Sequence, residues 1–242
     1  MKNNLLTSPD ERKARTQRNR EMITRFLRDE IFTDTEVLTE VLGFRHSNSV
    51  NKILEAMVRD DLLIKYRNGR KCLWGINKNG FVFSYNKSEE IPENFKTFRP
   101  SKFNPVTFEH RKQMQLLRIY LIESAGWSNW CSPRPVKGCS CPDAIAMSPK
   151  HGGKLVAIEF EKTLKASIRY TAILKAHLEA ILSKRYSSVL YVSPNPALLR
   201  RVERMFLHLV DKPMLIAEKT VMLSNDSLHA LFEFKTIDEI RR

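Results

Sequence analysis

The sequence contains no apolar run that approaches the length of a membrane span. A spanning helix needs about 20 consecutive apolar residues, and the longest runs here are far shorter. The opening residues, MKNNLLTS, also lack the apolar core of a signal peptide. We therefore expect a cytoplasmic protein without membrane insertion.

Cysteine is scarce, with four residues in a chain of 242. In a cytoplasmic protein such cysteines are expected to remain free thiols. Cys131, Cys139 and Cys141 lie close together with His151 nearby, but the paired C-x-x-C spacing of zinc ribbons is absent. Isolated thiols are the favoured interpretation, and a structural zinc site is the alternative.

Acidic residues are too few to balance the basic ones. Lys and Arg total 41 against 27 Asp and Glu, a formal net charge of +14. This excess favours polyanionic partners, chiefly nucleic acid, although solubility or an acidic membrane surface would also explain it. A hydrophobic fraction of 42% supports a folded core, and the length allows one large domain or two small ones.

Residues 1–84 have the pattern of a winged helix-turn-helix domain. A polar, basic arm extends to about residue 20 and is followed by an amphipathic helix. The sequence TDTE at positions 33–36 fits a capping box before a second helix, which is closed by Gly43. Two helices are therefore expected before residue 44.

A third helix and a β-hairpin complete this pattern. Ser47 or Asn48 is expected to cap the helix, which ends near Leu63 and has apolar residues at helical spacing: Val50, Ile53, Leu54, Met57 and Val58. The runs 64–67 and 70–74 then flank Asn-Gly, the strongest short hairpin signal.

The third helix and the hairpin form a candidate DNA-binding surface. In winged helices the exposed helix face enters the major groove and the basic wing meets phosphates. The residues expected to contact DNA are Ser49, Asn51, Lys52 and Arg59 on the helix and Lys65, Arg67, Arg70 and Lys71 on the wing. A protein-docking module, or a basic hairpin that merely protects a sheet edge, is the alternative.

The rest of the chain predicts a linker and a second domain. Residues 85–105 lose periodicity and contain three prolines among polar residues, which indicates an extended connection. Residues 106–242 predict a mixed sheet flanked by helices, so the chain as a whole is α/β (α+β). The expected order is helix 107–123, strands around 143 and 154–162, helix 166–184, strand 188–192, helix 198–210 and strand 214–217.

Carboxylates interrupt two of the apolar strands. Side chains alternate along strand 154–162, so Glu159 and Glu161 share one face with Ala157. A buried carboxylate pair is costly unless a cation or hydrogen bonds balance it. Asp143, from the neighbouring strand, would complete an oxygen-lined site for Mg²⁺ or Mn²⁺. The alternative is that the carboxylates lie at solvent-exposed strand ends, although the apolar residues beside them argue against exposure.

The order of these elements over residues 106–195 resembles the core of the PD-(D/E)XK nuclease superfamily. Three motifs that follow the winged helix resemble the MOBC relaxases, the family of the MobC mobilization proteins of bacterial plasmids: His110-Arg111-Lys112-Gln113, Pro142-Asp143-Ala144 and Glu159-Phe160-Glu161. The resemblance implies a metal-dependent endonuclease that nicks one strand at a plasmid origin of transfer during conjugation. It also implies a relaxosome accessory protein and a coupling protein as partners.

The resemblance assigns metal binding to Asp143 and Glu159, with Glu161 as a third ligand or as the group that orients the attacking water. The lysine of the acid-x-Lys pattern is displaced, because Glu161 occupies its slot. Lys162 should point away from Glu159. Lys162, Lys165 from the next turn, or Arg169 would therefore supply the cation that stabilises the phosphate.

One histidine, His110, is a candidate residue of the predicted metal site. His110 is expected to line the site with Glu109 and Gln113, and a hydrogen-bonded helix start is the alternative. The six histidines form no H-x-H pair, which argues against the histidine cluster and tyrosine nucleophile of the better-known relaxases. Two other functions stay open: a PD-(D/E)XK endonuclease outside mobilization, and an inactive DNA-binding regulator of plasmid replication or transfer, which the missing same-face lysine keeps open.

Overall fold

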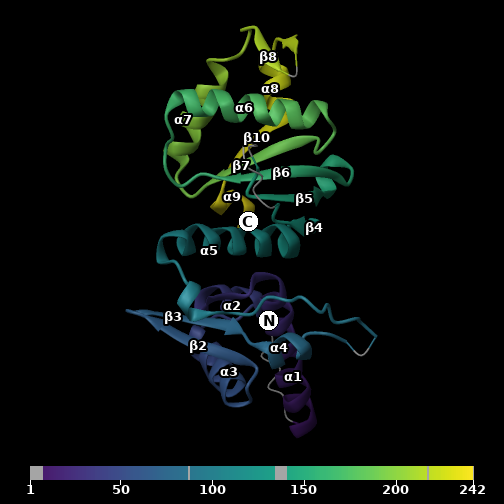
Figure 1. Ribbon diagram of the computed structural model, residues 1–242, viewed down its shortest axis with the longest axis vertical. Coiled ribbons are helices and arrows are strands. Elements are labelled where there is room, and N and C mark those ends of the chain that lie inside the picture. Colours follow the sequence, from purple (N-terminus) through teal and green to yellow (C-terminus); the bar gives the residue numbers. More distant parts are fainter. Residues whose placement is uncertain (1–7, 87, 134–140, 217, 242) are drawn as a thin grey trace. The chain divides into compact units, whose positions relative to one another are not determined.

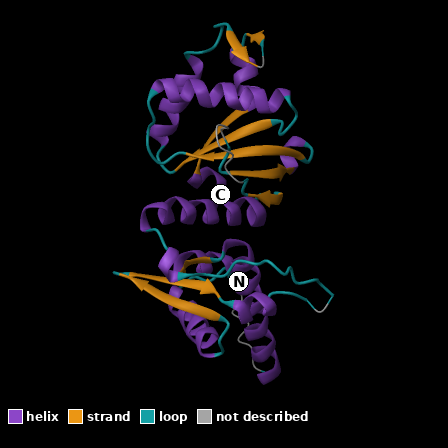
Figure 2. Ribbon diagram, viewed as in Figure 1, coloured by secondary structure: helices purple, strands orange, loops and turns teal. Residues whose placement is uncertain are grey.

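The computed structural model describes residues 8–86, 88–133, 141–216 and 218–241. The chain divides into two compact units, Met1–Leu116 and Leu117–Arg242. Both units combine helices with strands, which confirms the α/β (α+β) class (Figures 1 and 2). None of the helices in the described ranges has the length and apolar character that crossing a bilayer would require.

The first unit has helices packed around a small antiparallel sheet with strand order β1-β3-β2. The three helices and the hairpin expected from the sequence are present, and β1 is an additional strand that the sequence did not predict. The elements are α1 (Pro9–Glu30), β1 (Phe32–Asp34), α2 (Thr35–Val41), α3 (Ser47–Arg59), β2 (Leu63–Asn68), β3 (Lys71–Ile76), α4 (Lys78–Phe83), η1 (Pro100–Lys102) and the start of α5 (Pro105–Ile119).

The basic arm is helical from Pro9 onward, which corrects the expectation of a separate arm up to residue 20. The Ser8 hydroxyl accepts a hydrogen bond from the Asp10 amide at 3.2 Å, and the Glu11 carboxylate accepts one from the Ser8 amide at 3.3 Å. This is a capping box, with proline at the first helical position. The basic residues of the arm therefore lie along an exposed helix.

The cap of α2 is one residue later than expected. Asp34, not Thr33, is the N-cap, and its carboxylate accepts from the Val37 amide at 3.1 Å. Thr33 instead lies fully buried in β1, where its hydroxyl donates to the Gln115 side chain at 2.6 Å. The Thr33 hydroxyl, which the predicted capping box would have used, is therefore bonded to Gln115, 82 residues away in the sequence.

The third helix and the hairpin also differ from the sequence prediction in detail. Helix α3 begins at Ser47 after His46, which makes no side-chain capping bond, and ends at Arg59 rather than near Leu63. In the hairpin Asn68 pairs with Lys71, so the loop is Gly69-Arg70, one residue later than the Asn-Gly expected. Gly69 has φ +58°, which glycine adopts without strain.

The stretch expected as a linker packs on the first unit. The Phe98 amide donates to the Ile76 carbonyl at 2.9 Å, and Phe95 stacks on Phe81 with ring centroids 4.2 Å apart. The first turns of α5 belong to the same unit, because Lys112 pairs with Asp34 at 2.8 Å. The division of the chain thus falls at Leu116, within α5, rather than in residues 85–105. The prolines and polar residues of this stretch predicted a linker, although Phe95 and Phe98 hold it against the first unit.

The second unit contains a five-stranded sheet with strand order β10-β7-β6-β5-β4. Strands β4, β5 and β6 are antiparallel neighbours, whereas β6, β7 and β10 run parallel. The elements are η2 (Tyr120–Ser124), β4 (Ser128–Cys131), β5 (Ala144–Ser148), η3 (Pro149–His151), β6 (Lys154–Phe160), α6 (Ser167–Leu182), β7 (Ser188–Ser193), α7 (Pro196–Leu207), β8 (Met214–Ile216), β9 (Lys219–Val221), α8 (Asn225–Leu231), β10 (Phe232–Thr236) and α9 (Ile237–Arg241).

Strand β6, which carries Glu159, is the middle strand, as the sequence predicted for the carboxylates. Helices α6 and α7 pack on the sheet (Figure 1). Their buried side chains include Tyr170, Leu174 and Phe206. The expected strand at 214–217 does not join this sheet. Its described part, β8, pairs only with β9, and the edge next to β7 is taken by β10, which the sequence did not reveal.

Candidate functional site

The three predicted carboxylates lie at adjoining ends of β5 and β6. Strands β5 and β6 are paired with Ala144 opposite Ile158, and continuing this register by one residue sets Asp143 opposite Glu159. The Asp143 carboxylate accepts a hydrogen bond from the Phe160 amide at 2.8 Å. Glu161 follows directly, and its amide donates to the Val192 carbonyl of β7 at 2.8 Å. The backbone of three strands thus converges here.

Glu161 is buried, with only 2% of its surface exposed. Burial raises the pKa of its carboxyl, and the negative charges of Glu159 and Asp143 raise it further, which shows that the three carboxylates lie within electrostatic range. The Lys165 ammonium forms an ion pair with Glu161 and acts in the opposite direction on that pKa. A buried carboxylate needs such a partner to remain charged.

Lys165 is therefore the basic residue that the structure places beside the carboxylates. Its backbone amide donates to the Tyr170 hydroxyl at 3.2 Å, which ties the segment after β6 to the start of α6. Lys162 and Arg169 are exposed, and neither has an ion pair within the described ranges. Of the three predicted cations, only Lys165 contacts a carboxylate of this group.

His177 belongs to this site although the sequence did not single it out. It lies on α6 and is 2% exposed, with Nε2 3.3 Å from the Glu159 carboxylate. Its Nδ1 lies 2.7 Å from the Tyr186 hydroxyl, and the Tyr191 hydroxyl is 3.4 Å from Nε2. The available signal was a polar residue three positions after Leu174, on the apolar stripe of the helix that follows the acidic strand.

The tyrosines that surround His177 remain protonated. Burial raises the pKa of Tyr186 well above its ordinary value, and the nearby charge of Glu159 raises it further. Burial likewise raises the pKa of Tyr191, which is also close to Glu159. Both hydroxyls are thus neutral hydrogen-bonding groups at neutral pH.

The donor set suits a hard divalent cation in its chemistry, because Asp143, Glu159 and Glu161 offer carboxylate oxygens, the ligands that Mg²⁺ and Mn²⁺ prefer. Over the residues that the structure describes, however, no three His, Cys, Asp or Glu side chains are grouped closely enough to hold a metal ion. Glu159 faces His177 and Glu161 faces Lys165. A cation at this place would therefore compete with protein partners for both glutamates.

The described cysteines near this site are free thiols, as favoured from the sequence. Cys131 and Cys141 form no disulfide, and Cys139 lies outside the described residues. Burial raises the pKa of Cys141, and the charges of Glu159 and Asp143 add to this effect. The described thiols and His151 do not form a metal-holding group.

The residues expected to line the site from the preceding helix lie in the first unit. Glu109, His110 and Gln113 occur in the part of α5 before Leu117. Glu109 pairs with Lys71 of the hairpin. In the same motif Arg111 lies over the Phe32 ring, with its guanidinium carbon 4.6 Å from the ring centroid. The contacts given above for Asp143, Glu159 and Glu161 join residues of the second unit.

The predicted DNA-binding surface is largely accessible. Ser49, Lys52, Arg59, Arg67, Arg70 and Lys71 are exposed, whereas Asn51 and Lys65 are half-buried. Lys65 pairs with Glu55, and Lys71 with Glu109, so carboxylates hold two of the predicted cations. The Asn51 side chain accepts from the Thr35 hydroxyl at 3.0 Å, which in turn accepts from the Trp74 indole at 2.9 Å.

The two surfaces differ in chemistry. The first unit presents exposed cations on α3 and the hairpin, and the second unit gathers carboxylates around one lysine and one histidine. Comparison of the chain with protein-family models, curated proteins and solved structures finds no match. The function is therefore inferred from these residues alone.

Proposed function

We propose that the protein is a metal-dependent DNA endonuclease that nicks one strand at a plasmid origin of transfer, as a relaxase of MOBC type. The observation that carries this proposal is the convergence of Asp143, Glu159 and Glu161 at the ends of adjoining strands, with Lys165 ion-paired to the buried member. A basic surface in the other unit supplies the affinity for DNA.

In this proposal Asp143 and Glu159 hold Mg²⁺ or Mn²⁺, and Glu161 either contributes a further oxygen or orients the attacking water. The bound cation would neutralise charge on the scissile phosphate and lower the pKa of a bound water. Lys165, held in place by Glu161, stabilises the negative charge that builds up on the phosphate oxygens. His177 keeps the Glu159 side chain in one orientation through its contact at 3.3 Å.

The first unit delivers the DNA. Lys52, Arg59 and Arg70 are exposed and have no ion pair in the described part of the chain, so they are available to phosphates or base edges. Lys65 and Lys71 reach DNA after exchanging a glutamate for a phosphate. The proposed setting is the cytoplasm, with an accessory protein and a coupling protein of the transfer machinery as partners.

A second candidate is a DNA-binding regulator that does not cleave. The observation that favours it is the engagement of Glu159 by His177 and of Glu161 by Lys165, which leaves no preformed three-ligand group among the described residues. A third candidate, an endonuclease outside mobilization, would use the same carboxylates on both strands of its target.

One assay separates the three. Supercoiled plasmid that carries its cognate origin is incubated with the full chain and Mg²⁺ or Mn²⁺, and the products are resolved on a gel. Conversion to relaxed circles supports nicking, and conversion to linear DNA supports an endonuclease that cuts both strands. Binding without conversion supports the regulator. A plasmid that lacks the origin is the matched control.

A further inference from the structure

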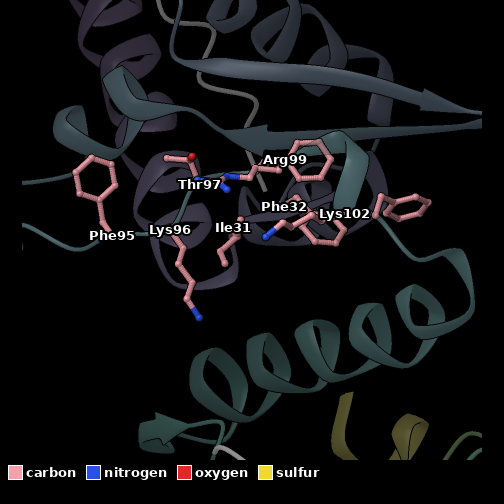
Figure 3. Close-up of a pocket in the computed structure, with 9 residues that line it drawn as sticks. Ile31, Phe32, Phe95, Lys96, Thr97, Arg99 and Lys102 are labelled. Atoms are coloured by element: carbon pink, nitrogen blue, oxygen red, sulfur yellow. The ribbon is translucent and has the colours of Figure 1, made fainter.

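A basic, aromatic pocket lies in the first unit next to the hairpin, because Tyr66 of β2 contacts Phe98 and Phe103 of its lining. Its volume is about 440 Å³, within the range of about 300–1,000 Å³ typical of ligand sites. Figure 3 shows the side chains that line it. They are Ile31, Phe32, Phe95, Lys96, Thr97, Phe98, Arg99, Lys102 and Phe103.

Three rings of this pocket, those of Phe32, Phe98 and Phe103, are in contact with one another, whereas Phe95 stacks on Phe81. Phe32 stacks on Phe98 with centroids 4.8 Å apart, and Phe103 meets Phe32 edge-on at 5.9 Å. Phe98 is buried, whereas Phe32 and Phe103 are half-buried and keep part of their rings accessible. Gly75 permits this arrangement, because a Cβ there would lie 2.2 Å from the Phe98 ring. Phe98 stacks on Phe32 and the Arg111 guanidinium also lies over the Phe32 ring, so the accessible aromatic surface of the pocket is mainly that of the half-buried Phe95 and Phe103.

The cations of the pocket form no ion pair with the residues that the structure describes. These cations are Lys96, Arg99 and Lys102, and all three are exposed. Two other lysines of the same unit are paired, in Lys65–Glu55 and Lys112–Asp34, whereas Lys52 and Lys78 form no ion pair in the described part of the chain. The pocket lining contains no carboxylate. Positive charge next to accessible aromatic surface fits a ligand that is itself anionic and planar.

We propose that this pocket binds single-stranded nucleic acid, with an unstacked base on the accessible rings and neighbouring phosphates on Lys96, Arg99 and Lys102. Base stacking on aromatic side chains together with backbone contacts to cations is how proteins hold single strands. Duplex DNA is excluded from the rings because its bases are already stacked. The proposal goes beyond cleavage, since it needs neither a metal nor the carboxylates of the second unit.

The test measures fluorescence anisotropy of a labelled short oligothymidylate on the full chain in EDTA, so that cleavage plays no part. Lys102→Ala should weaken binding several-fold and make the salt dependence shallower by about 0.7 in log–log slope, the value for one phosphate on a single strand. Lys78→Ala is the matched control, because Lys78 is exposed in the same unit and lies outside the pocket. It should leave both quantities unchanged.

Aromatic variants test the stacking. Phe103→Leu should weaken the oligothymidylate complex about tenfold, as loss of one base–aromatic stack does, and Phe103→Tyr should restore it. Thermal denaturation shows whether Phe103→Leu folds. If it does not, the oligothymidylate affinities of Phe103→Tyr and Lys102→Ala test the proposal. A labelled duplex should bind all four variants as it binds the wild type. An oligouridylate arm shows whether DNA or RNA is the preferred strand, and binding of either supports the pocket.

Two results would overturn this assignment. Equal losses for Lys102→Ala and Lys78→Ala would mean that the single strand senses only net charge. Unchanged single-strand affinity in Phe103→Leu and Lys102→Ala, or a duplex affinity that falls by the same factor, would equally contradict it. Neither result bears on plasmid nicking, which the proposed function predicts from the second unit.

Discussion

The Glu159 carboxylate lies 3.3 Å from Nε2 of His177, a histidine that is almost wholly buried on α6. The other ring nitrogen is 2.7 Å from the Tyr186 hydroxyl. The Glu159 carboxylate at the end of the central strand is thus linked through the imidazole of His177 to the Tyr186 hydroxyl. This chain of contacts gives Glu159 a fixed orientation, which a site for a cation and a phosphate requires.

The His177–Tyr186 contact should appear as a coupling energy. Tyr186→Phe removes one buried hydrogen bond and should cost about 1 kcal/mol of unfolding free energy. His177→Gln should cost about 1–3 kcal/mol, because it leaves buried polar groups without a partner. Urea denaturation of both single variants and the double variant should give a coupling above about 0.5 kcal/mol. Strict additivity would show that the contact contributes nothing to stability.

Lysines 162 and 165 should differ in their effect on stability. Lys165→Ala leaves the buried Glu161 carboxylate without its ion pair and should cost about 1–3 kcal/mol at neutral pH. Lys162→Ala alters an exposed residue and should stay within about 0.5 kcal/mol. Chemical denaturation measures both values. Equal costs for the two variants would refute the pairing.

The Glu161–Lys165 pair should make the free energy of unfolding depend on pH. Burial raises the pKa of Glu161, so between the ordinary carboxyl pKa and the raised one the folded protein binds more protons than the unfolded chain. Stability from this group therefore falls as pH rises through that window. Loss of Lys165 removes an opposing effect and raises the pKa further. The cost of Lys165→Ala should accordingly be smaller near pH 4.5 than at neutral pH, and a cost independent of pH would contradict this.

The hairpin offers a matched pair of changes for duplex binding. Arg70 has no ion pair in the described part of the chain, whereas Lys71 is held by Glu109. Arg70→Ala should weaken binding and reduce the salt slope by about 0.9, the value for one duplex phosphate contact. Glu109→Gln should strengthen binding, because it releases Lys71 for the DNA. Titration of a labelled origin duplex at several salt concentrations measures both, and unchanged affinity in both variants would exclude the hairpin from the interface.

Local signals in the sequence were enough for much of the fold. Alternation in residues 154–160 placed the central strand, and helical spacing placed α3 and α6. Strands β1 and β10 escaped prediction because β1 is short and the pairing of both is non-local. Thr33 shows the same limit. Its neighbours in the sequence predicted that its hydroxyl would cap a helix, but in the structure the hydroxyl donates to the distant Gln115 side chain.

The sequence indicated which charged residues lie near one another at the candidate site, but not all of their contacts. The observed strand register sets Asp143 opposite Glu159, and Lys165, one of the three cations that the sequence offered, pairs with Glu161. His177 was missed because its link to Glu159 joins a helix to a strand across the core, which sequence spacing does not encode. The grouping of Glu109 with Lys71 was missed for the same reason.

The central claim is that the carboxylates at the ends of β5 and β6 cleave DNA. Its most direct measurement is conversion of supercoiled origin plasmid by wild type, Asp143→Ala and Glu159→Ala, with duplex binding measured on the same preparations. The account predicts relaxed circles with the wild type in Mg²⁺ or Mn²⁺, and at least about a hundredfold loss of conversion in each variant with binding nearly unchanged. Full conversion by either variant, or none by the wild type, would contradict it.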